Sequence, residues 1–232
     1  MYKNNRFLAV IPARGGSKGI PKKNIVNVLG KPLIQYSIEE AIHSKYIDKL
    51  IVSTDDKEIK KTSIECGAEV PFLRPKELAT DSSKTIDTLI HAIDYFRQRG
   101  ESFDYIILLQ PTQPLRKHWH IDKAIEKIVT TNENGLVSVS KVKDHPILIR
   151  EKDENDNLAR LINITSTVRR QDFLDYYKVN GAIYINKIDT NFNNDLSLND
   201  NPLGFVMDSQ YNIDIDEPID LEVLKIMLKK LV

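Results

Sequence analysis

The sequence predicts an α/β fold built on a mostly parallel sheet. Apolar runs and amphipathic helical stretches alternate through the first half of the chain, and this alternation implies strand–helix–strand crossover units. The run from Ile106 to Leu109 is entirely apolar, as a strand covered on both faces of a sheet requires. Apolar residues recur at helical spacing between Ile86 and Arg99, which indicates a helix packed on such a sheet.

Each element follows from a local pattern. Short apolar runs predict strands at Phe7–Ile11, Leu50–Ser53, Ala68–Phe72, Tyr105–Leu109 and Leu136–Ser140. Longer stretches with apolar residues on one side predict helices at Leu33–Ser44, Asp56–Cys66, Ile86–Arg99, His118–Thr130 and Ile219–Leu231. Pro218 suits the start of the last helix. Residues 191–201 are rich in Asn and Asp and predict a loop, after which regular structure resumes at Gly204–Met207.

The pattern changes after residue 140. The segment from Lys141 to Tyr177 is polar and offers only short extended stretches such as Ile147–Ile149, with a hairpin turn expected at Asp153–Asn157. We therefore predict a core of residues 1–140 and 180–232 and an arm of residues 141–179. Because the arm lacks the apolar pattern of a core of its own, it should bury its apolar residues against a second subunit.

Composition narrows the class of protein. Lys plus Arg equal Asp plus Glu at 33 each, which argues against a non-specific binder of nucleic acid or of a membrane surface. Cys66 is the single cysteine, so an internal disulfide is excluded and a cytoplasmic location is expected. No apolar run approaches the ~18 residues of a membrane span. The N-terminal residues also lack the long apolar segment of a secretory signal.

The stretch from Ile11 to Asn24 carries the strongest functional signal. It follows a predicted strand and combines three glycines with Arg14 and three lysines. Glycines allow tight turns and present bare N–H groups to an anion, and the basic side chains add positive charge. This pattern predicts a phosphate-binding loop, although its spacing matches neither the Walker A box nor the dinucleotide fingerprint. An ordinary basic surface loop is the alternative.

A second candidate is the pair Asp214 and Asp216. On a strand, positions i and i+2 point to the same face, so the two carboxylates could share a hard cation such as Mg²⁺. A polar edge strand facing water is the alternative. Asp55 follows a predicted strand and could contact a ligand, support the site or cap the next helix.

Four segments together resemble the acylneuraminate cytidylyltransferases. They are Ile11–Asn24, Leu108–Arg116, Asn180–Ile185 and Asn212–Asp216, which occur in the family's order and span nearly all of the 232 residues. The resemblance implies a Rossmann-like nucleotidyltransferase sheet with a small dimerisation arm, and hence a homodimer. It also implies transfer of CMP from CTP to a nine-carbon acidic sugar, with release of pyrophosphate.

The expected nucleotide contacts come mainly from the first loop. Attack of a hydroxyl on an α-phosphate needs positioning and neutralisation of charge, which cations and backbone N–H groups supply. We expect nucleotide contacts from Ala13, Arg14, Gly15, Gly16, Ser17, Lys18 and Lys23, and the resemblance adds Asn24 at the end of the loop and Arg74 and Thr85 on the cytosine side. Arg14, Lys18 and Asp216 are the expected catalytic residues.

For the sugar and the metal, the residue assignments rest on the resemblance. It implies sugar contacts by Gln110, Arg170, Lys178 and Tyr184, and Mg²⁺ held by Asp214 and Asp216. An arginine suits the sugar carboxylate because its guanidinium can bind bidentately. Arg116 has two open interpretations, a structural ion pair or a ligand contact. His118 and His120 are expected to be surface or capping residues rather than metal ligands.

Two rival functions stay open at this point. One is activation of 3-deoxy-manno-octulosonate, an eight-carbon acidic sugar, and the other is a non-catalytic nucleotide-sugar-binding protein on the same fold. Within the resembled family, residues 193–199 lack the paired aromatic residues of members specific for N-acetylneuraminate. Legionaminic and pseudaminic acids are therefore also candidate substrates.

Overall fold

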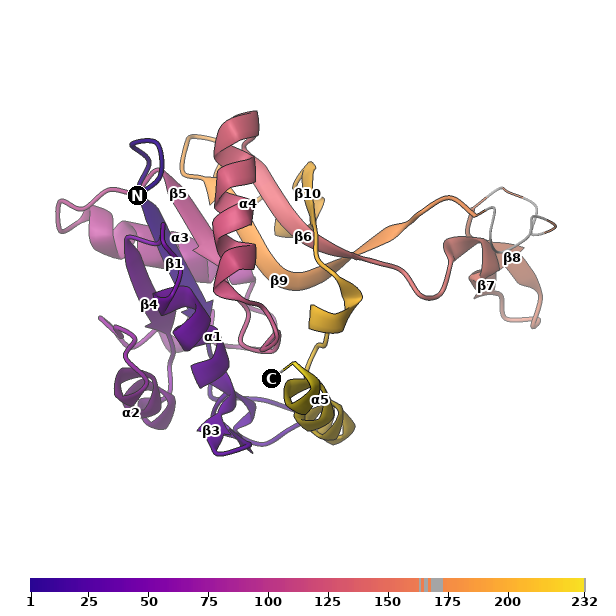
Figure 1. Ribbon diagram of the computed structural model, residues 1–232, viewed down its shortest axis with the longest axis horizontal. Helices are drawn as coiled ribbons and strands as arrows, with labels where there is room; N and C mark the ends of the chain where they lie inside the picture. The colour runs from indigo at the N-terminus through magenta and orange to yellow at the C-terminus, as the bar shows by residue number, and fades with distance from the viewer. Residues whose placement is uncertain (163, 165–166, 168–172, 232) are drawn as a thin grey trace.

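A mixed six-stranded sheet forms the centre of the computed structural model, in the order β10-β6-β9-β5-β1-β4 (Figure 1). The structure describes residues 1–162, 164, 167 and 173–231. The sheet strands are β1 (Phe7–Pro12), β4 (Lys49–Ser53), β5 (Tyr105–Leu108), β6 (Gly135–Lys141), β9 (Tyr177–Lys187) and β10 (Leu203–Val206). Two small hairpins lie outside it, β2 (Asn27–Val28) with β3 (Lys31–Pro32) and β7 (Arg150–Lys152) with β8 (Leu158–Arg160). The helices are α1 (Leu33–Ile42), α2 (Lys57–Glu65), α3 (Thr85–Arg97), α4 (His118–Thr131) and α5 (Pro218–Lys230).

The strand directions confirm the predicted α/β class with a mostly parallel sheet. β1 pairs in parallel with β4 and β5, and β10 pairs in parallel with β6. β9 runs antiparallel to both of its neighbours, β5 and β6. The reason is visible in Figure 1, where the chain leaves the sheet through β6 and returns directly along β9. A parallel partner would need a crossover, usually an α-helix, back across the sheet, and no α-helix lies between these strands in the described residues.

Helices cover both faces of the sheet. In β1, Phe7 and Ile11 face the cluster formed with α1, α2 and α4, whereas Leu8 and Val10 face the cluster formed with α3. This alternation follows from the period of two along a strand. The apolar runs predicted for strands are therefore buried on both sides, as expected of a sheet between two helical layers.

β1 lies at a switch point of the topology. Its neighbour β4 is reached through α1 on one face, and its other neighbour β5 follows α3 on the opposite face. Connections that diverge in this way leave a crevice beyond the carboxyl ends of the strands, where ligands bind in open α/β sheets. The loops after β1 and β5 border this crevice, so the fold places the predicted phosphate-binding loop there.

A third apolar cluster joins the two ends of the chain. It includes Ile20 of the first loop, Leu33 of α1, Ile213 and Ile215 of the segment before α5, and Leu224 of α5. These side chains are at most 9% exposed. The cluster therefore holds the segment before α5 beneath the first loop.

Two local predictions are wrong. Ala68–Phe72 forms no strand and contributes only the isolated bridge of Glu69 to Ile51. Pro71 lacks the N–H that would continue this pairing. Ile147–Ile149 is not an extended run either, because a short 3-10 helix occupies Pro146–Leu148 and buries Ile147.

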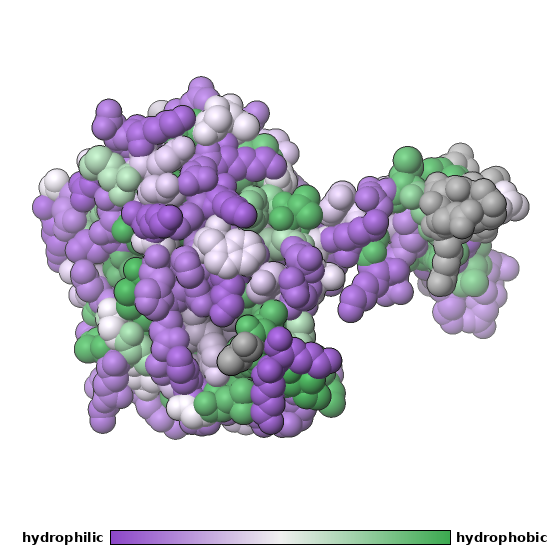
Figure 2. All heavy atoms as spheres, viewed as in Figure 1, coloured by the Kyte–Doolittle hydropathy of each residue, from purple (hydrophilic) through white to green (hydrophobic). Residues whose placement is uncertain are grey.

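The hairpin of β7 and β8 projects away from the sheet at the end of an extended connection (Figure 1). Its turn is the predicted one, with the Asp153 N–H donating to the Asn157 carbonyl at 3.0 Å. Hydrophobic side chains gather on this projection beside hydrophilic ones (Figure 2), and those exposed there include Leu148, Leu158, Leu161 and Leu174. The division into core and arm remains a prediction. Among the described residues, no helix has the length and apolar character needed to span a membrane.

Candidate functional site

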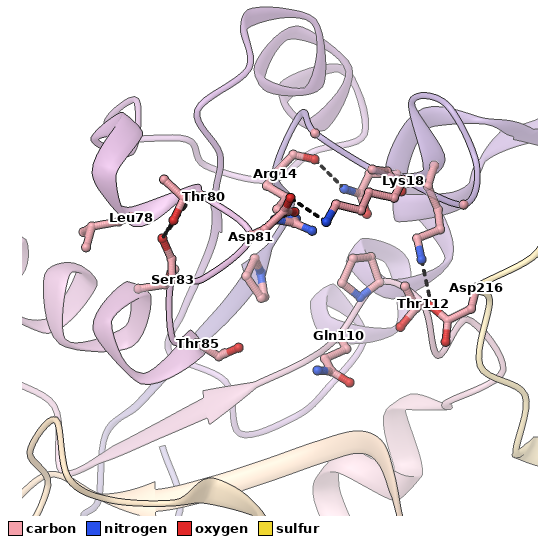
Figure 3. A pocket seen from close by; sticks show the side chains of 18 of the residues that line it. Arg14, Lys18, Leu78, Thr80, Asp81, Ser83, Thr85, Gln110, Thr112 and Asp216 are labelled. Carbon is pink, nitrogen blue, oxygen red and sulfur yellow. Dashed lines mark hydrogen bonds and ion pairs between the residues drawn. The ribbon is translucent and has the colours of Figure 1, made fainter.

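A cavity of about 620 Å³ opens at the carboxyl edge of the sheet, beyond β1 and β5 (Figure 3). Its walls come from the first loop, the segment leading into α3, the loop after β5 and the start of α5. Most of the predicted nucleotide residues line it, namely Arg14, Gly16, Ser17, Lys18, Lys23, Asn24, Arg74 and Thr85. Gln110 and Asp216 also lie on its wall. Segments far apart in the sequence thus converge where the phosphate-binding loop was expected.

The first loop is packed directly against the segment before α5. A Cβ atom on Gly19 would lie 2.3 Å from the Asp216 carbonyl oxygen, so only glycine fits without a shift of backbone. The Lys23 ammonium donates to the Ile215 carbonyl at 2.8 Å and to the Asp216 carboxylate at 3.0 Å. Asn24 closes the loop by donating to the Arg14 carbonyl at 3.0 Å. These contacts fix the loop relative to the aspartates.

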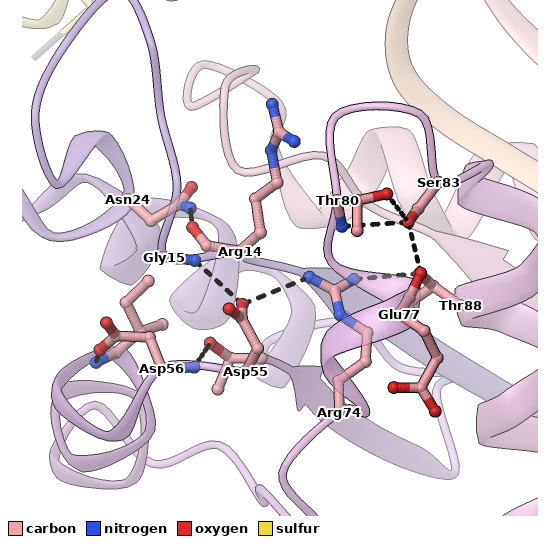
Figure 4. A network of polar contacts seen from close by, with 12 residues as sticks. Arg14, Gly15, Asn24, Asp55, Asp56, Arg74, Glu77, Thr80, Ser83 and Thr88 are labelled. Atoms are coloured by element: carbon pink, nitrogen blue, oxygen red, sulfur yellow. Dashed lines mark hydrogen bonds and ion pairs between the residues drawn. The ribbon is translucent and has the colours of Figure 1, made fainter.

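A network of polar side chains that includes the buried Arg74 is hydrogen-bonded to the first loop (Figure 4). The Arg74 guanidinium is 5% exposed, donates to the Thr88 hydroxyl at 3.0 Å and lies 3.8 Å from an Asp55 carboxylate oxygen. The same Asp55 oxygen accepts the Gly15 N–H at 3.0 Å. Burial lowers the pKa of Arg74, and the Asp55 charge opposes that shift. Asp55 therefore supports the loop, while its neighbour Asp56 caps α2 by accepting from Glu58 and Ile59 N–H groups.

Ala13 and Gly15 do not line the cavity. The Ala13 N–H donates to the Ser53 carbonyl at 2.9 Å, and the Gly15 N–H is taken by Asp55. Both backbone donors are therefore already used inside the protein. The expected contact of Ala13 and Gly15 with a nucleotide stays a prediction, and their visible role is to shape the loop.

Asp81 joins the two cations predicted to act in catalysis. Its carboxylate lies 2.7 Å from Arg14 and 2.8 Å from Lys18, in the cavity itself (Figure 3). The hydrogen bond from Lys18, followed by that from Arg14, lowers the pKa of Asp81. Hydroxyls of Thr80 and Ser83 bond to each other at 2.7 Å and fold the turn that presents it. Sequence analysis missed Asp81 because an Asp in a Ser/Thr-rich turn has many ordinary roles.

A second cavity of about 470 Å³ adjoins the first. It is lined by Gln110, Lys178 and Tyr184, three of the predicted sugar residues, together with Asp214. Tyr184 is 6% exposed and its hydroxyl donates to the Asn199 side chain at 3.0 Å. Gln110 lines both cavities, so it marks their boundary. Arg170, the fourth predicted sugar residue, lies outside the described residues.

Asp214 and Asp216 lie on an extended segment that is not part of a sheet. Ile213 and Ile215 are buried while the aspartates are accessible, as alternation predicts, but the aspartates line different cavities. Enough protein surrounds Asp214 to raise the pKa of its carboxyl by desolvation. A hydrogen bond with Thr112 opposes this shift and the charge of Asp216 adds to it. The pair therefore sits where the two cavities meet.

The described residues contain no group of three or more His, Cys, Asp or Glu side chains that could hold a metal ion alone. Mg²⁺ seldom needs such a group, since it is usually held by one or two carboxylates together with substrate phosphates and water. Asp214 and Asp216 fit that pattern.

Arg116 and the two histidines near it have structural roles. Arg116 is 1% exposed and donates to the Ala182 carbonyl at 2.7 Å, which ties the loop after β5 to β9. Burial lowers the pKa of Arg116 to about 9. His120 accepts the Lys117 N–H at 3.0 Å and caps α4, and its burial lowers its pKa to about 4. His118 pairs with Glu40.

Comparison with known families and proteins gives a consistent result. A family model described as cytidylyltransferase matches residues 8–227. The chain is 38% identical over 216 residues to a CMP-N,N'-diacetyllegionaminic acid synthase of Legionella pneumophila subsp. pneumophila, covering 93% of each protein. It is 33% identical over 223 residues to a pseudaminic acid cytidylyltransferase of Campylobacter jejuni subsp. jejuni, covering 96% of each. An N-acylneuraminate cytidylyltransferase of Streptococcus agalactiae is 33% identical over 211 residues, which are 90% of this chain and 50% of that protein.

Solved structures share the fold at low sequence identity. A CMP:2-keto-3-deoxy-manno-octonic acid synthetase complexed with CTP superposes with a TM-score of 0.72 at 17% identity, covering 98% of this chain and all (100%) of that one. A 4-diphosphocytidyl-2C-methyl-D-erythritol synthase gives a TM-score of 0.69 at 13% identity, with 97% and 99% covered. At these identities the likeness establishes the architecture alone.

The packing at Gly19 predicts that alanine substitutions at Gly19 and Gly16, in the same loop, have very different effects on stability. Gly19→Ala would press a methyl group onto the Asp216 carbonyl and should destabilise the protein by about 1–3 kcal/mol, as overpacking does. Gly16→Ala is the matched control, because nothing lies within 4 Å of its added Cβ. Thermal unfolding of both variants measures the effect, with a lower Tm expected only for Gly19→Ala. Equal melting temperatures for the two variants would contradict the tight packing.

Proposed function

The chain belongs to the cytidylyltransferase family, and on that basis we propose that it transfers CMP from CTP to the anomeric hydroxyl of a nine-carbon acidic sugar, releasing pyrophosphate. The observation that carries this proposal is the position of Gln110, which lines both the cavity of the basic first loop and the cavity of Lys178 and Tyr184. A nucleotide in the first cavity and a sugar in the second would thus meet at one residue. Such juxtaposition is the main requirement of an in-line phosphoryl transfer.

The first cavity suits a triphosphate. Arg14 and Lys18 supply positive charge, and the exposed loop at Gly16 and Ser17 brings backbone close to the same space. The buried Arg74 and the hydroxyl of Thr85 also line this cavity and would contact the cytosine side. The growing charge on the departing pyrophosphate would be stabilised by the same two cations that bind it.

The second cavity suits an acidic sugar. Lys178 offers a cation for its carboxylate, and Tyr184 and Gln110 offer hydrogen-bonding groups. The relatives that match at 33–38% identity are named for legionaminic, pseudaminic and N-acylneuraminic acids, which supports a nine-carbon acceptor over 3-deoxy-manno-octulosonate. Arg170 is a further proposed contact for the carboxylate.

A panel of acceptors tests the proposed function. The protein is mixed with CTP, Mg²⁺ and, one at a time, N-acetylneuraminic, legionaminic or pseudaminic acid or 3-deoxy-manno-octulosonate, and pyrophosphate release is followed. We expect release with at least one nine-carbon acid and none without sugar. Release with 3-deoxy-manno-octulosonate and with no nine-carbon acid would instead assign the protein to activation of that eight-carbon sugar. No release with any acceptor would favour a nucleotide-sugar-binding protein.

We propose that Asp214 and Asp216 hold the Mg²⁺ that neutralises triphosphate charge during the reaction. Asp216→Asn should abolish turnover without unfolding the protein, and Asp214→Asn should have the same or a milder effect. Because the pKa of Asp214 is raised, this carboxyl takes up its proton at a higher pH than an ordinary aspartate as the solution is acidified. As the pH is lowered, activity at limiting Mg²⁺ should therefore begin to fall at a higher pH than the pKa of an ordinary aspartate would predict. Near-wild-type rates of both variants at limiting Mg²⁺ would exclude the site.

The ion pairs of Asp81 predict a competition with substrate. A bound triphosphate would replace Asp81 at Arg14 and Lys18, so Asp81→Asn should lower the KM for CTP. Both pairs are largely exposed to solvent, which weakens them, so the decrease in KM should be modest, roughly 2- to 10-fold. Glu58→Gln is the matched control, since Glu58 pairs with Lys22 outside the cavity. A higher KM in Asp81→Asn would instead assign Asp81 a direct part in binding CTP.

We also propose a cytoplasmic homodimer in which the arm contacts the second subunit. Leu158 and Leu174, at 65% and 72% exposed, are the most exposed large apolar side chains among the described residues of the arm, and this contact would cover them. Leu158→Glu and Leu174→Glu should shift light-scattering masses from dimer to monomer, whereas Ile64→Glu on α2 should not. A fully active wild-type monomer at assay concentration would contradict the dimer.

A further inference from the structure

Gln113 is a buried amide without a hydrogen-bond partner on the wall of the second cavity. It is 1% exposed, and neither its Oε1 nor its Nε2 has a partner among the described residues. Its backbone is fixed, because its N–H donates to the Gln110 carbonyl at 3.2 Å. A buried polar group that is left unpaired destabilises the folded protein. We therefore looked to a bound ligand for the group that hydrogen-bonds the Gln113 amide.

Two other amides around this cavity, Asn180 and Asn199, are hydrogen-bonded within the protein. Asn180 accepts from the Ser138 hydroxyl at 2.6 Å and donates to the Ser140 hydroxyl at 2.9 Å. Asn199 accepts from Tyr184. Gln113 differs from both, because neither its Nε2 donor nor its Oε1 acceptor has a partner among the described residues.

The charged groups of the cavity indicate that Gln113 would contact an uncharged part of the sugar. Lys178 is the cation suited to the sugar carboxylate, and Asp214 would repel a carboxylate placed beside it. A carboxamide offers one acceptor oxygen and an N–H donor on the same group. An acylamino group is a complementary partner, because its carbonyl can accept from the carboxamide N–H or its own N–H can donate to the carboxamide oxygen. The two groups lie on opposite sides of a trans amide, so Gln113 would bond one of them. A hydroxyl held directly on the sugar ring lacks the reach of the acyl carbonyl.

We propose that Gln113 is a specificity-determining residue that pairs with an acylamino group of the sugar, an inference that rests on the proposed function. Rotation about its side-chain bonds brings the shielded amide to the cavity surface, and the unpaired state of that amide favours the rotation. An acceptor with a hydroxyl in place of the acylamino group lacks the carbonyl and the N–H that would bond Gln113. Sites built to hydrogen-bond a polar substituent discriminate in this way against analogues that lack it.

The test compares two acceptors in two proteins. The acceptors are the acylamino nine-carbon acid that gives the fastest pyrophosphate release in the panel and its counterpart with a hydroxyl in place of the acylamino group. Gln113→Leu removes both polar atoms at similar size. We expect kcat/KM for the acylamino acceptor to fall roughly 10- to 100-fold, and that for the hydroxyl acceptor to change less than about 3-fold. The KM for CTP should stay unchanged, and Gln113→Asn should restore part of the preference.

Stability separates this role from a structural one. Removing an amide that has no partner should leave the Tm of Gln113→Leu unchanged or higher. The rival is a bond from Gln113 to the unpaired guanidinium atoms of Arg116, three residues on, through a buried water. That rival predicts a lower Tm and the same fold-change for both acceptors, and either result would overturn the inference. If Gln113→Leu fails to fold, Gln113→Met replaces it in the kinetic comparison.

The same experiment distinguishes failure of the inference from failure of the proposed function. Wild-type protein that releases no pyrophosphate with any acylamino acceptor would overturn the function and, with it, the inference. Active wild-type protein with equal losses for both acceptors in Gln113→Leu would overturn the inference alone.

Discussion

Close packing between the first loop and the segment before α5 sets the geometry of the first cavity. Gly19 leaves room for the Asp216 carbonyl where a Cβ atom would come within 2.3 Å, and Lys23 bonds the same segment across 192 and 193 positions of sequence. The apolar cluster of Ile20, Ile215 and Leu224 holds both parts together. The cations of the loop and the carboxylate of Asp216 therefore share one cavity only because the two ends of the domain are in contact.

The second cavity depends on the direction of β9. The chain leaves the sheet at Lys141, forms the projecting hairpin and returns through Tyr177 as an antiparallel strand. This return places Lys178 and Tyr184 beside Gln110, at the end of β5. The Arg116 bond to the Ala182 carbonyl then fixes β9 to the loop after β5. The projecting hairpin and the second cavity are thus consequences of one excursion of the chain.

Most of the fold follows from local patterns. The strands β1 and β5 and all five helices lie close to their predicted positions because burial between two helical layers leaves continuous apolar runs and amphipathic faces in the sequence. The strand expected at Ala68–Phe72 fails because an apolar run does not ensure a partner, and Pro71 stops the pairing after one bridge. The antiparallel direction of β9 could not be predicted either, since direction depends on how the chain returns to the sheet.

By itself, the sequence determined the α/β class and predicted a phosphate-binding loop after the first strand, because both rest on periodicity and short motifs. Tertiary structure decided which groups meet. Asp81 reaches Arg14 and Lys18 across more than sixty positions, and Asp55 supports Gly15 from another strand. It also places Asp214 and Asp216 where the two cavities meet, and it buries the Gln113 amide without a partner among the described residues. Pairing and burial depend on neighbours distant along the chain, and no local pattern records them.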